Sequence, residues 1–341
     1  MSTTTRQEPR GLGSARFPVS KGLVTIGAAT VLLFVVCAVF ARSSVSPTSL
    51  QGMLPIAAVL AVAGLGQMLV VQQGGIDLSV AGALSLAVVT VTHVPDQDND
   101  LLLPAVVLAV GFALVGGLAN GLLIGGLGLN PIIATLGTNA LLYGVNLGIS
   151  GGRPRITTAA LQDVMTGSVL GIPFSVFFAL AALLVVTVLV RRTVPGRRFE
   201  FVGANARAAR AVGLRTRLHQ TSAYVWAQLL YCLAGIMIAG ITAQPSAYSG
   251  DSFLLISVAV VVLGGTSLLG GRGYPLATVV AAVFLEQLVQ FVLALGVSTA
   301  VQTIVQAAAL ALGVSLYTVD WAGIWRRATG RRRRAAVTAA A

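Results

Sequence analysis

The feature of this sequence that most constrains its fold is a series of apolar runs, each about as long as a bilayer is thick. A helix needs about 20 apolar residues to cross the hydrocarbon core. With 56% hydrophobic and 9% charged residues, the composition excludes an ordinary soluble domain. The sequence therefore predicts an all-α, polytopic helical membrane protein with about ten transmembrane helices. The runs lie at 22–41, 53–71, 79–94, 102–125, 131–150, 171–190, 222–243, 253–269, 276–296 and 300–319.

The basic residues predict the orientation of these helices, because Lys and Arg accumulate in short loops on the cytoplasmic side. Residues 191–220 form one long polar segment and hold eight of the 22 basic residues. Ten helices place both tails on one side, and if that side is the cytoplasm of a bacterium only Arg42, Arg153 and Arg155 fall outside. We expect a disordered cytoplasmic N-terminal tail, a transmembrane domain containing the cytoplasmic loop, and a basic cytoplasmic C-terminal tail, at 1–21, 22–320 and 321–341.

Within the loop at 191–220 we expect a short helix over residues 204–212. Gly203 and Gly213 bracket this segment, which is rich in Ala and Arg, and Gly commonly follows a helix end. Two interpretations stay open, a handle gripped by a soluble partner and a positively charged topology anchor. The net charge of +12 does not indicate nucleic-acid binding, because the basic residues lie at segment ends and in one loop and do not alternate with aromatic residues that could stack on bases. Contact with the anionic headgroups of the lipid bilayer explains the charge better.

The sequence lacks the metal-site and nucleotide-binding motifs that many enzymes carry. Its two histidines, His93 and His219, are not part of a Cys or His cluster with the spacing of a metal site. A Walker loop needs Gly-Lys followed by Ser or Thr, and Lys21 is the only lysine. We therefore expect no catalytic residue, no metal and no cofactor bound by this chain.

Polar residues inside the apolar runs indicate where a solute could pass, because such groups are costly in hydrocarbon and face the bundle interior. Amides, hydroxyls and aromatic rings suit a neutral, hydroxyl-rich solute. The alternative is hydrogen bonding between helices without a solute. Glu286, with Gln290 one turn later, is either a proton or ion site or a structural carboxylate. The candidate substrate-path residues lie at helical spacing in two runs: Thr135, Asn139, Tyr143 and Asn146, and Tyr224, Gln228 and Tyr231.

The segment GGIDLSV at residues 74–80 is the sharpest local pattern. Gly74 and Gly75 can end one helix, and the oxygens of Asp77 and Ser79 can accept the free amides of the next. A weak echo, VVLGGTS at residues 261–267, indicates either an internal repeat, as in many transporters, or coincidence in a Gly-rich chain.

Four motifs in this order carry a family resemblance: GGIDLSV, NGLLIGGLGLNPIIATLGT at 120–138, GGRP at 151–154 and GGTSLLGGRG at 264–273, which includes Gly264, Gly265, Gly270 and Gly271. Over about residues 50–318 the chain resembles the permease subunits of sugar-importing ABC transporters, the ribose/xylose/galactose permease family. The resemblance implies a dimer with a second permease subunit, an ABC ATPase subunit docked on the cytoplasmic side, and an extracytoplasmic solute-binding protein. ATP and Mg²⁺ would then be bound by the partner ATPase.

Residue by residue, Ala208, Ala209 and Gly213 resemble the A-A-x-x-x-G core of the coupling segment that ABC importers insert into their ATPases. Two positions depart from the pattern. Arg207 stands where many importers have Glu, and Tyr143 stands where many sugar permeases have Arg.

The sequence thus predicts the permease subunit of an ATP-driven importer of a small polar solute, with a monosaccharide favoured. The alternatives are a branched-chain amino-acid or nucleoside ABC permease, and an ion-coupled secondary transporter or channel that uses Glu286. An intramembrane enzyme is disfavoured by the missing motifs. Whether the dimer consists of identical chains is not decided by the sequence.

Overall fold

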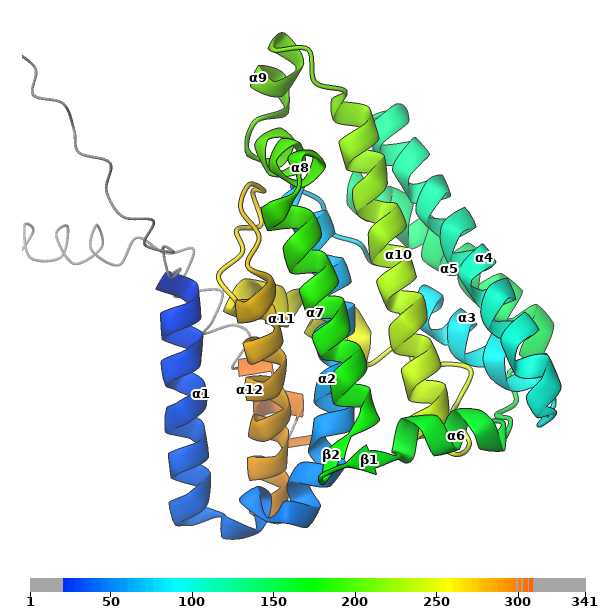
Figure 1. Ribbon diagram of the computed structural model, residues 1–341, viewed down its shortest axis with the longest axis vertical. Coiled ribbons are helices and arrows are strands. Elements are labelled where there is room, and N and C mark those ends of the chain that lie inside the picture. The colour runs from blue at the N-terminus through cyan, green and yellow to red at the C-terminus, as the bar shows by residue number, and fades with distance from the viewer. Residues whose placement is uncertain (1–20, 299, 302, 306, 309–341) are drawn as a thin grey trace, which may run out of the picture.

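The computed structural model describes residues 21–298, 300–301, 303–305 and 307–308, and this part of the chain is almost entirely helical (Figure 1). The expected N-terminal and C-terminal tails and most of the run at 300–319 lie outside the described residues. The main helices are α1 (Lys21–Phe40), α2 (Pro47–Gln72), α3 (Val80–His93), α4 (Leu102–Gly121), α5 (Pro131–Ser150), α7 (Phe174–Arg192), α10 (Thr216–Ile241), α11 (Phe253–Leu263) and α12 (Pro275–Ala294). Shorter elements connect them: η1 (Arg42–Val45), η2 (Asn99–Leu101), the π-helical η3 (Leu122–Gly126), α6 (Ala159–Thr166), β1 (Ser168–Val169), β2 (Ile172–Pro173), α8 (Val194–Ala204) and α9 (Ala206–Ala211).

Seven helices of the described part are long and apolar enough to cross a membrane: α1, α2, α4 with its flanking turns, α5, α7, α10 and α12. The runs at 79–94 and 253–269, which we expected to be full spans, form only the 14-residue α3 and the 11-residue α11. At 1.5 Å per residue these rise about 21 and 17 Å, short of the roughly 30 Å hydrocarbon core. α11 stops early because Gly265 turns the chain with a φ of +83°.

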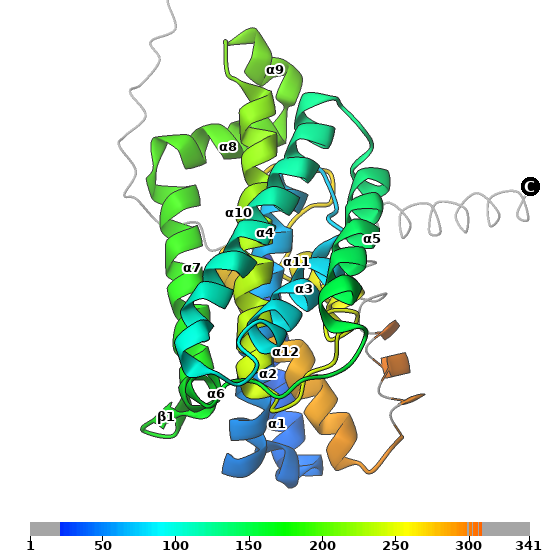
Figure 2. The ribbon, with the colours of Figure 1, turned by 90° about the vertical axis from the view of Figure 1, so that its right-hand side faces the viewer.

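The core is built around α2, which has protein on nearly every side. In the most apolar part of α2, 83% of the residues are buried, against 67% in α10 and 11% in α1. α2 packs against α7, α10, α11 and α12, and the short α3 is buried throughout between α4, α5 and α10. A helix that is apolar on all sides is stable only in such a position or in lipid. The helices α1, α4, α5 and α7 lie on the outside of the bundle (Figure 2). They leave large apolar side chains exposed, as lipid-facing helices do.

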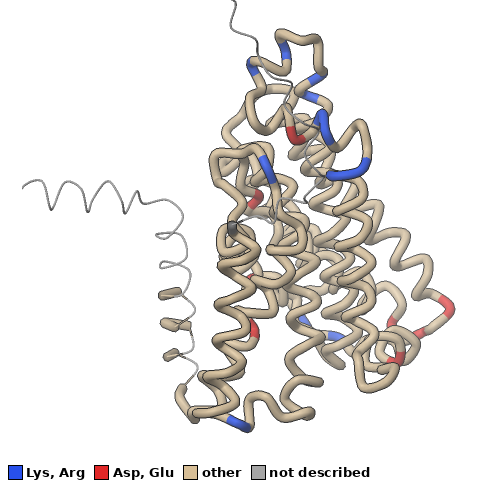
Figure 3. The backbone as a smooth tube through the Cα atoms, turned by 60° about the vertical axis from the view of Figure 1, so that its left-hand side comes forward, with Lys and Arg blue, Asp and Glu red and all other residues tan. Residues whose placement is uncertain are grey.

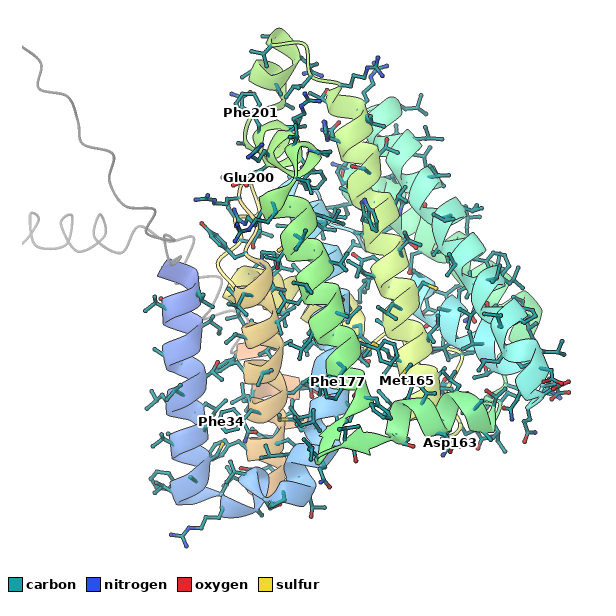
Figure 4. All side chains as sticks on the ribbon, viewed as in Figure 1. Phe34, Asp163, Met165, Phe177, Glu200 and Phe201 are labelled. Atoms are coloured by element: carbon teal, nitrogen blue, oxygen red, sulfur yellow. The ribbon has the colours of Figure 1, made fainter. Side chains whose placement is uncertain are left out.

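Most Lys and Arg residues of the described chain lie at one end of the bundle, and this distinguishes the two ends (Figure 3). We call the end that carries α8 and α9 the basic end, and the end that carries α6, β1 and β2 the opposite end. Figure 4 shows Glu200 at the basic end and Asp163 and Met165, both on α6, at the opposite end. Arg272 belongs to the basic end, because it pairs with Glu200 at 2.9 Å. At the opposite end Arg155 pairs with Asp96 at 3.2 Å.

The segment at 191–220 is not a loop but a continuation of helices. α8 was not predicted, although Thr193 caps it by accepting from the Gly196 amide at 3.1 Å. The expected short helix is α9, and it begins at Ala206 rather than Ala204 because Asn205 caps its first amides at 3.0 and 3.1 Å. Gly213 ends it as expected, with a φ of +81°.

Candidate functional site

The break between α2 and α3 lies inside the protein and is organised by Asp77. Gly74 leaves α2 with a φ of +79°, as its sequence position indicated. The Asp77 carboxylate is fully buried and accepts both the backbone amide, at 2.9 Å, and the hydroxyl of Ser79. Asp77 therefore holds the amide of residue 79, directly before α3, whereas the prediction was that it accepts an amide of the first turn. The Ser79 side chain makes no capping bond.

Ser79 instead joins three helices. Its Oγ accepts from Asn120 Nδ2 on α4 at 2.9 Å and from Gln228 Nε2 on α10 at 2.7 Å. Because the single hydroxyl hydrogen goes to Asp77, both amides must present their nitrogens to Ser79. We call Asp77, Ser79, Asn120 and Gln228 the Asp77 cluster. Asn120 was not predicted, although an Asn in an apolar run was a signal for it.

Gln67 fixes the same break from the side of α2. In the orientation that satisfies both amide atoms, the Gln67 side-chain oxygen accepts from the Asp77 amide and the side-chain nitrogen donates to the Asp77 carbonyl, each at 3.1 Å. The Gln67 amide also lies 2.7 Å from the Tyr231 hydroxyl. Gly66 permits this contact, because a Cβ at that position would lie 2.7 Å from the Tyr231 ring. Gln67 was also missed in the sequence, where it lies in the middle of an otherwise apolar run.

The predicted polar face of α5 is turned against protein. Thr135 Oγ1 accepts from the Leu78 amide at 3.0 Å, Asn139 Oδ1 from the Gly82 amide at 2.8 Å, and Asn146 Nδ2 donates to the Ala247 carbonyl at 2.6 Å. These contacts hold the break, α3 and the segment after α10 in place. They are the hydrogen bonds between helices that the alternative interpretation of this face described.

Tyr143 is the member of the α5 set that reaches an open surface. Its hydroxyl donates to the exposed Asp251 and lies 3.2 Å from Ser85 Oγ, and its ring centroid is 5.9 Å from that of Tyr248. Tyr248 is 47% exposed. Two aromatic rings beside a carboxylate provide a stacking surface and a hydrogen-bond acceptor. We call Tyr143, Tyr248 and Asp251 the aromatic cluster.

The three predicted residues of α10 do not share one environment. Gln228 belongs to the Asp77 cluster and Tyr231 bonds Gln67, whereas Tyr224 lines a polar cavity of about 400 Å³ at the basic end. Arg210 and Arg217 also line this cavity, together with Gly74, Gly75 and the turn after α4. Tyr224, which lines the cavity, is one helical turn before Gln228 on α10. Tyr224 therefore lies between the cavity and the Asp77 cluster.

Glu286 is half-buried on α12 and makes no hydrogen bond or ion pair with the residues that the structure describes. The amide one turn on, Gln290, does not partner it there either. The buried amide of this helix is Gln287, whose Nε2 lies 3.2 Å from Cys37 Sγ. The two sequence interpretations of Glu286 thus both remain predictions.

The second glycine motif ties the end of α2 to α8. Gly270 and Gly271 have φ values of +89° and +103°, and the Gly271 amide donates to the Gln72 carbonyl at 2.9 Å. A Cβ on Gly270 would lie 2.8 Å from the Gly203 carbonyl of α8. Beside this contact Glu200 pairs with Arg272 at 2.9 Å.

The predicted coupling residues separate into exposed and buried positions. Arg207, Ala208 and Gly213 are exposed at the tip of the basic end. Ala209 is fully buried, and its carbonyl accepts from the Leu214 amide at 3.0 Å. Ala209 is therefore small because it packs inside the α9 turn, and the surface available to a partner is formed by its neighbours.

A bundle of apolar helices, with a broken helix at its centre and a polar cavity beside the break, defines a membrane transport protein. The chain matches the family "Branched-chain amino acid transport system / permease component" over residues 49–314. It belongs to this family and is a multi-pass membrane permease component.

Curated relatives cover most of the chain. It is 32% identical over 290 residues to the ribose import permease protein of Bacillus subtilis (strain 168), covering 84% of this chain and 89% of that one. It is 33% identical over 235 residues to the galactofuranose transporter permease protein of Escherichia coli (strain K12), covering 67% and 68%. It is 30% identical over 257 residues to a probable ABC transporter permease protein of Sinorhizobium fredii, covering 75% and 77%. No solved structure matches the chain.

Proposed function

We propose that this chain is the membrane-spanning permease subunit of an ATP-driven ABC importer that carries a monosaccharide into a bacterial cell. The names of the relatives, a ribose and a galactofuranose permease among them, support a sugar as the solute. The observation that carries the proposal is the continuous set of contacts from α9 at the basic end to the break between α2 and α3.

The basic end is the cytoplasmic face in this proposal, because Lys and Arg mark that side. A partner ABC ATPase contacts the exposed surface of α9 around Arg207 and Ala208, binds ATP and Mg²⁺, and hydrolyses ATP. This chain supplies no nucleotide site. An acidic surface on the ATPase suits α9, since residues 201–220 contain no Asp or Glu.

Movement of α9 reaches the break through close backbone contacts. α9 follows α8 directly, and Gly203 on α8 packs against the Gln72 carbonyl, to which a Cβ would come within 2.1 Å. The Gly271 amide holds the same carbonyl. A push on α9 therefore acts on the last residue of α2, next to the turn that carries Asp77.

The solute path has two polar regions with the Asp77 cluster between them. From the opposite end, where an extracytoplasmic binding protein delivers the solute, the aromatic cluster offers rings and a carboxylate. At the basic end the cavity beside Tyr224 receives the solute.

A second permease subunit completes the path. The exposed face of α5 suits close helix packing in such a dimer. It carries Gly137, Gly144 and Gly148, and a Cβ at any of these positions would have no neighbour within 4 Å.

Uptake into cells tests this function. The chain is expressed with an ABC ATPase and a binding protein encoded beside its gene, and uptake of labelled ribose, galactose and allose is compared with that of leucine. We expect sugar uptake that stops when ATP is depleted and persists when an ionophore collapses ion gradients. Leucine uptake would favour the amino-acid alternative, and loss of uptake with the ionophore alone would favour an ion-coupled transporter using Glu286.

A further inference from the structure

An apolar crevice lies beneath α8, on the outer side of the bundle away from the cavity at Tyr224. α7 contributes Val186, Leu189 and Val190 to it, α8 contributes Phe199, and α10 contributes Trp226. One end of the crevice is polar, where His219 and Ser222 line it. Neither the Asp77 cluster nor the proposed solute path uses it.

The crevice is open to the surface that faces hydrocarbon in a membrane. Leu184 and Val188 on α7 are 65% and 42% exposed, and Trp226 on α10 is 44% exposed. The crevice therefore continues the lipid-facing surface, and an acyl chain can enter it sideways without passing through water. α8 runs across the end of α7 (Figure 2), with Phe199 and Val202 buried on one side, which is how an amphipathic helix lies at a membrane interface.

α8, which covers the crevice, also carries two arginines that are not themselves among the residues lining it. Arg197 and Arg198 are exposed on α8 and form no hydrogen bond or ion pair through their side chains with the described residues. Arg198 lies within Coulombic range of His219. Glu200, the acidic residue of α8, is held by Arg191 at 3.3 Å and Arg272 at 2.9 Å. The rim therefore carries uncompensated positive charge at the depth of lipid headgroups.

We infer that this crevice binds one anionic phospholipid of the basic-end leaflet, with an acyl chain against Leu189 and Trp226 and the phosphate at Arg197 and Arg198. The shape and the charge both select this ligand. The apolar floor needs hydrocarbon, whereas the guanidinium groups at its end favour an anionic headgroup over a zwitterionic one.

The position of the lipid gives it a structural role. Its chain would fill the space under α8, whose Gly196 turn is packed so tightly against α7 that a Cβ would lie 2.0 Å from the Leu189 carbonyl. The lipid would thus hold α8, and with it α9, in place. Its effect on coupling to an ATPase rests on the proposed function, but its binding does not.

Fluorescence of Trp226 measures this binding directly. The chain has three tryptophans, so Trp321→Phe with Trp325→Phe leaves Trp226 as the single reporter. The purified full chain is reconstituted in phosphatidylcholine bilayers. In one series brominated phosphatidylglycerol replaces increasing fractions of the lipid, and in the other series brominated phosphatidylcholine replaces the same fractions. The ratio of the two quenching constants is the lipid selectivity, and we expect phosphatidylglycerol to be preferred about fivefold or more, the factor that a basic residue contributes near an anionic headgroup.

Two pairs of variants test the two halves of the site. Replacing both arginines of α8, by Arg197→Gln with Arg198→Gln, should bring the lipid selectivity close to one. The control Arg217→Gln replaces an arginine that lines the cavity at Tyr224 instead, and it should leave the lipid selectivity unaltered. Leu189→Phe should also abolish selectivity by filling the crevice, whereas Leu184→Phe on the lipid-exposed side of α7 should not.

Any of three results would overturn the inference. These are a selectivity near one in the parent protein, selectivity that survives loss of both arginines, and selectivity that survives Leu189→Phe. The last would show that α8 attracts anionic lipid by surface charge alone. Size-exclusion chromatography confirms that each variant is folded before reconstitution. Because no transport is measured, failure here is distinguishable from failure of the proposed function.

Discussion

Removing the Ser79 hydroxyl should destabilise the bundle far more than the size of the change suggests. Ser79→Ala leaves Asn120 Nδ2 and Gln228 Nε2 without their acceptor, and Asp77 keeps only the backbone amide of residue 79. A buried polar group left unsatisfied costs about 1 to 3 kcal/mol. Two amides therefore cost about 4 kcal/mol, which lowers the melting temperature by about 6 °C in a chain of this size.

A matched control is present on α11. Ser257 is fully buried like Ser79, but its Oγ donates only to the Leu254 carbonyl three residues earlier, at 3.3 Å. Ser257→Ala removes the same atom and leaves no amide unpaired. We expect a loss of about 1 kcal/mol or less, or about 1 °C.

Unfolding can be measured through the two natural cysteines, so no reporter residue has to be introduced. Cys37 and Cys232 are buried, at 0% and 2% exposure, so a thiol-reactive dye in detergent fluoresces only as the helices separate. Melting temperatures of the parent and both variants are read from the same assay. Equal shifts in Ser79→Ala and Ser257→Ala would refute the argument that Ser79 joins α3, α4 and α10.

Three further predictions follow from the charges and contacts. Reporter fusions after Asn99 should report the outside and fusions after Asn205 the cytoplasm, and an outside signal at Asn205 would invert the proposed orientation. Ala208→Trp should leave the permease folded but stop co-purification of the ATPase, whereas Ala209→Trp should unfold the α9 turn. Co-purification of the ATPase with a folded Ala208→Trp variant would show that α9 is not part of the interface. Asp251→Asn should weaken sugar uptake about tenfold in apparent affinity, the value of one charged hydrogen bond, and an unchanged uptake curve would exclude the aromatic cluster from the path.

The sequence was sufficient to predict the helices wherever hydrophobicity decided the outcome. The run at 131–150 coincides with α5, because Asn130 with Pro131 starts a helix and Gly151 ends it. The run at 253–269 gave a much shorter helix than expected. Its apolar composition is the same whether residues after Leu263 face lipid or fold back into the protein. Gly265 turns the chain out of the helix, and the Gly271 amide then holds the returning chain to the Gln72 carbonyl of α2.

The sequence marked many polar residues of the candidate site, but it missed Gln67 and Asn120 and did not show which partners any of these residues have. Polar side chains in an apolar run must find partners, so the sequence correctly marked Thr135 and Asn146 as inward-facing. It did not show that their partners are backbone groups, of the broken segment for Thr135 and of the segment after α10 for Asn146, rather than a solute. Ala209 is a similar case, since a small residue suits either a tight turn or a close interface.

The sequence by itself determined that this is a helical membrane protein with one basic end, because hydrophobic length and the positions of arginines act locally along the chain. Only the tertiary structure decided which polar groups meet. Asp77 and Gln228 are far apart in the chain and share Ser79 as a partner, since the break between α2 and α3 leaves backbone and side-chain groups that only a neighbouring helix can satisfy. The identity of that neighbour depends on how the helices pack, and packing depends on the shapes of all the buried side chains together.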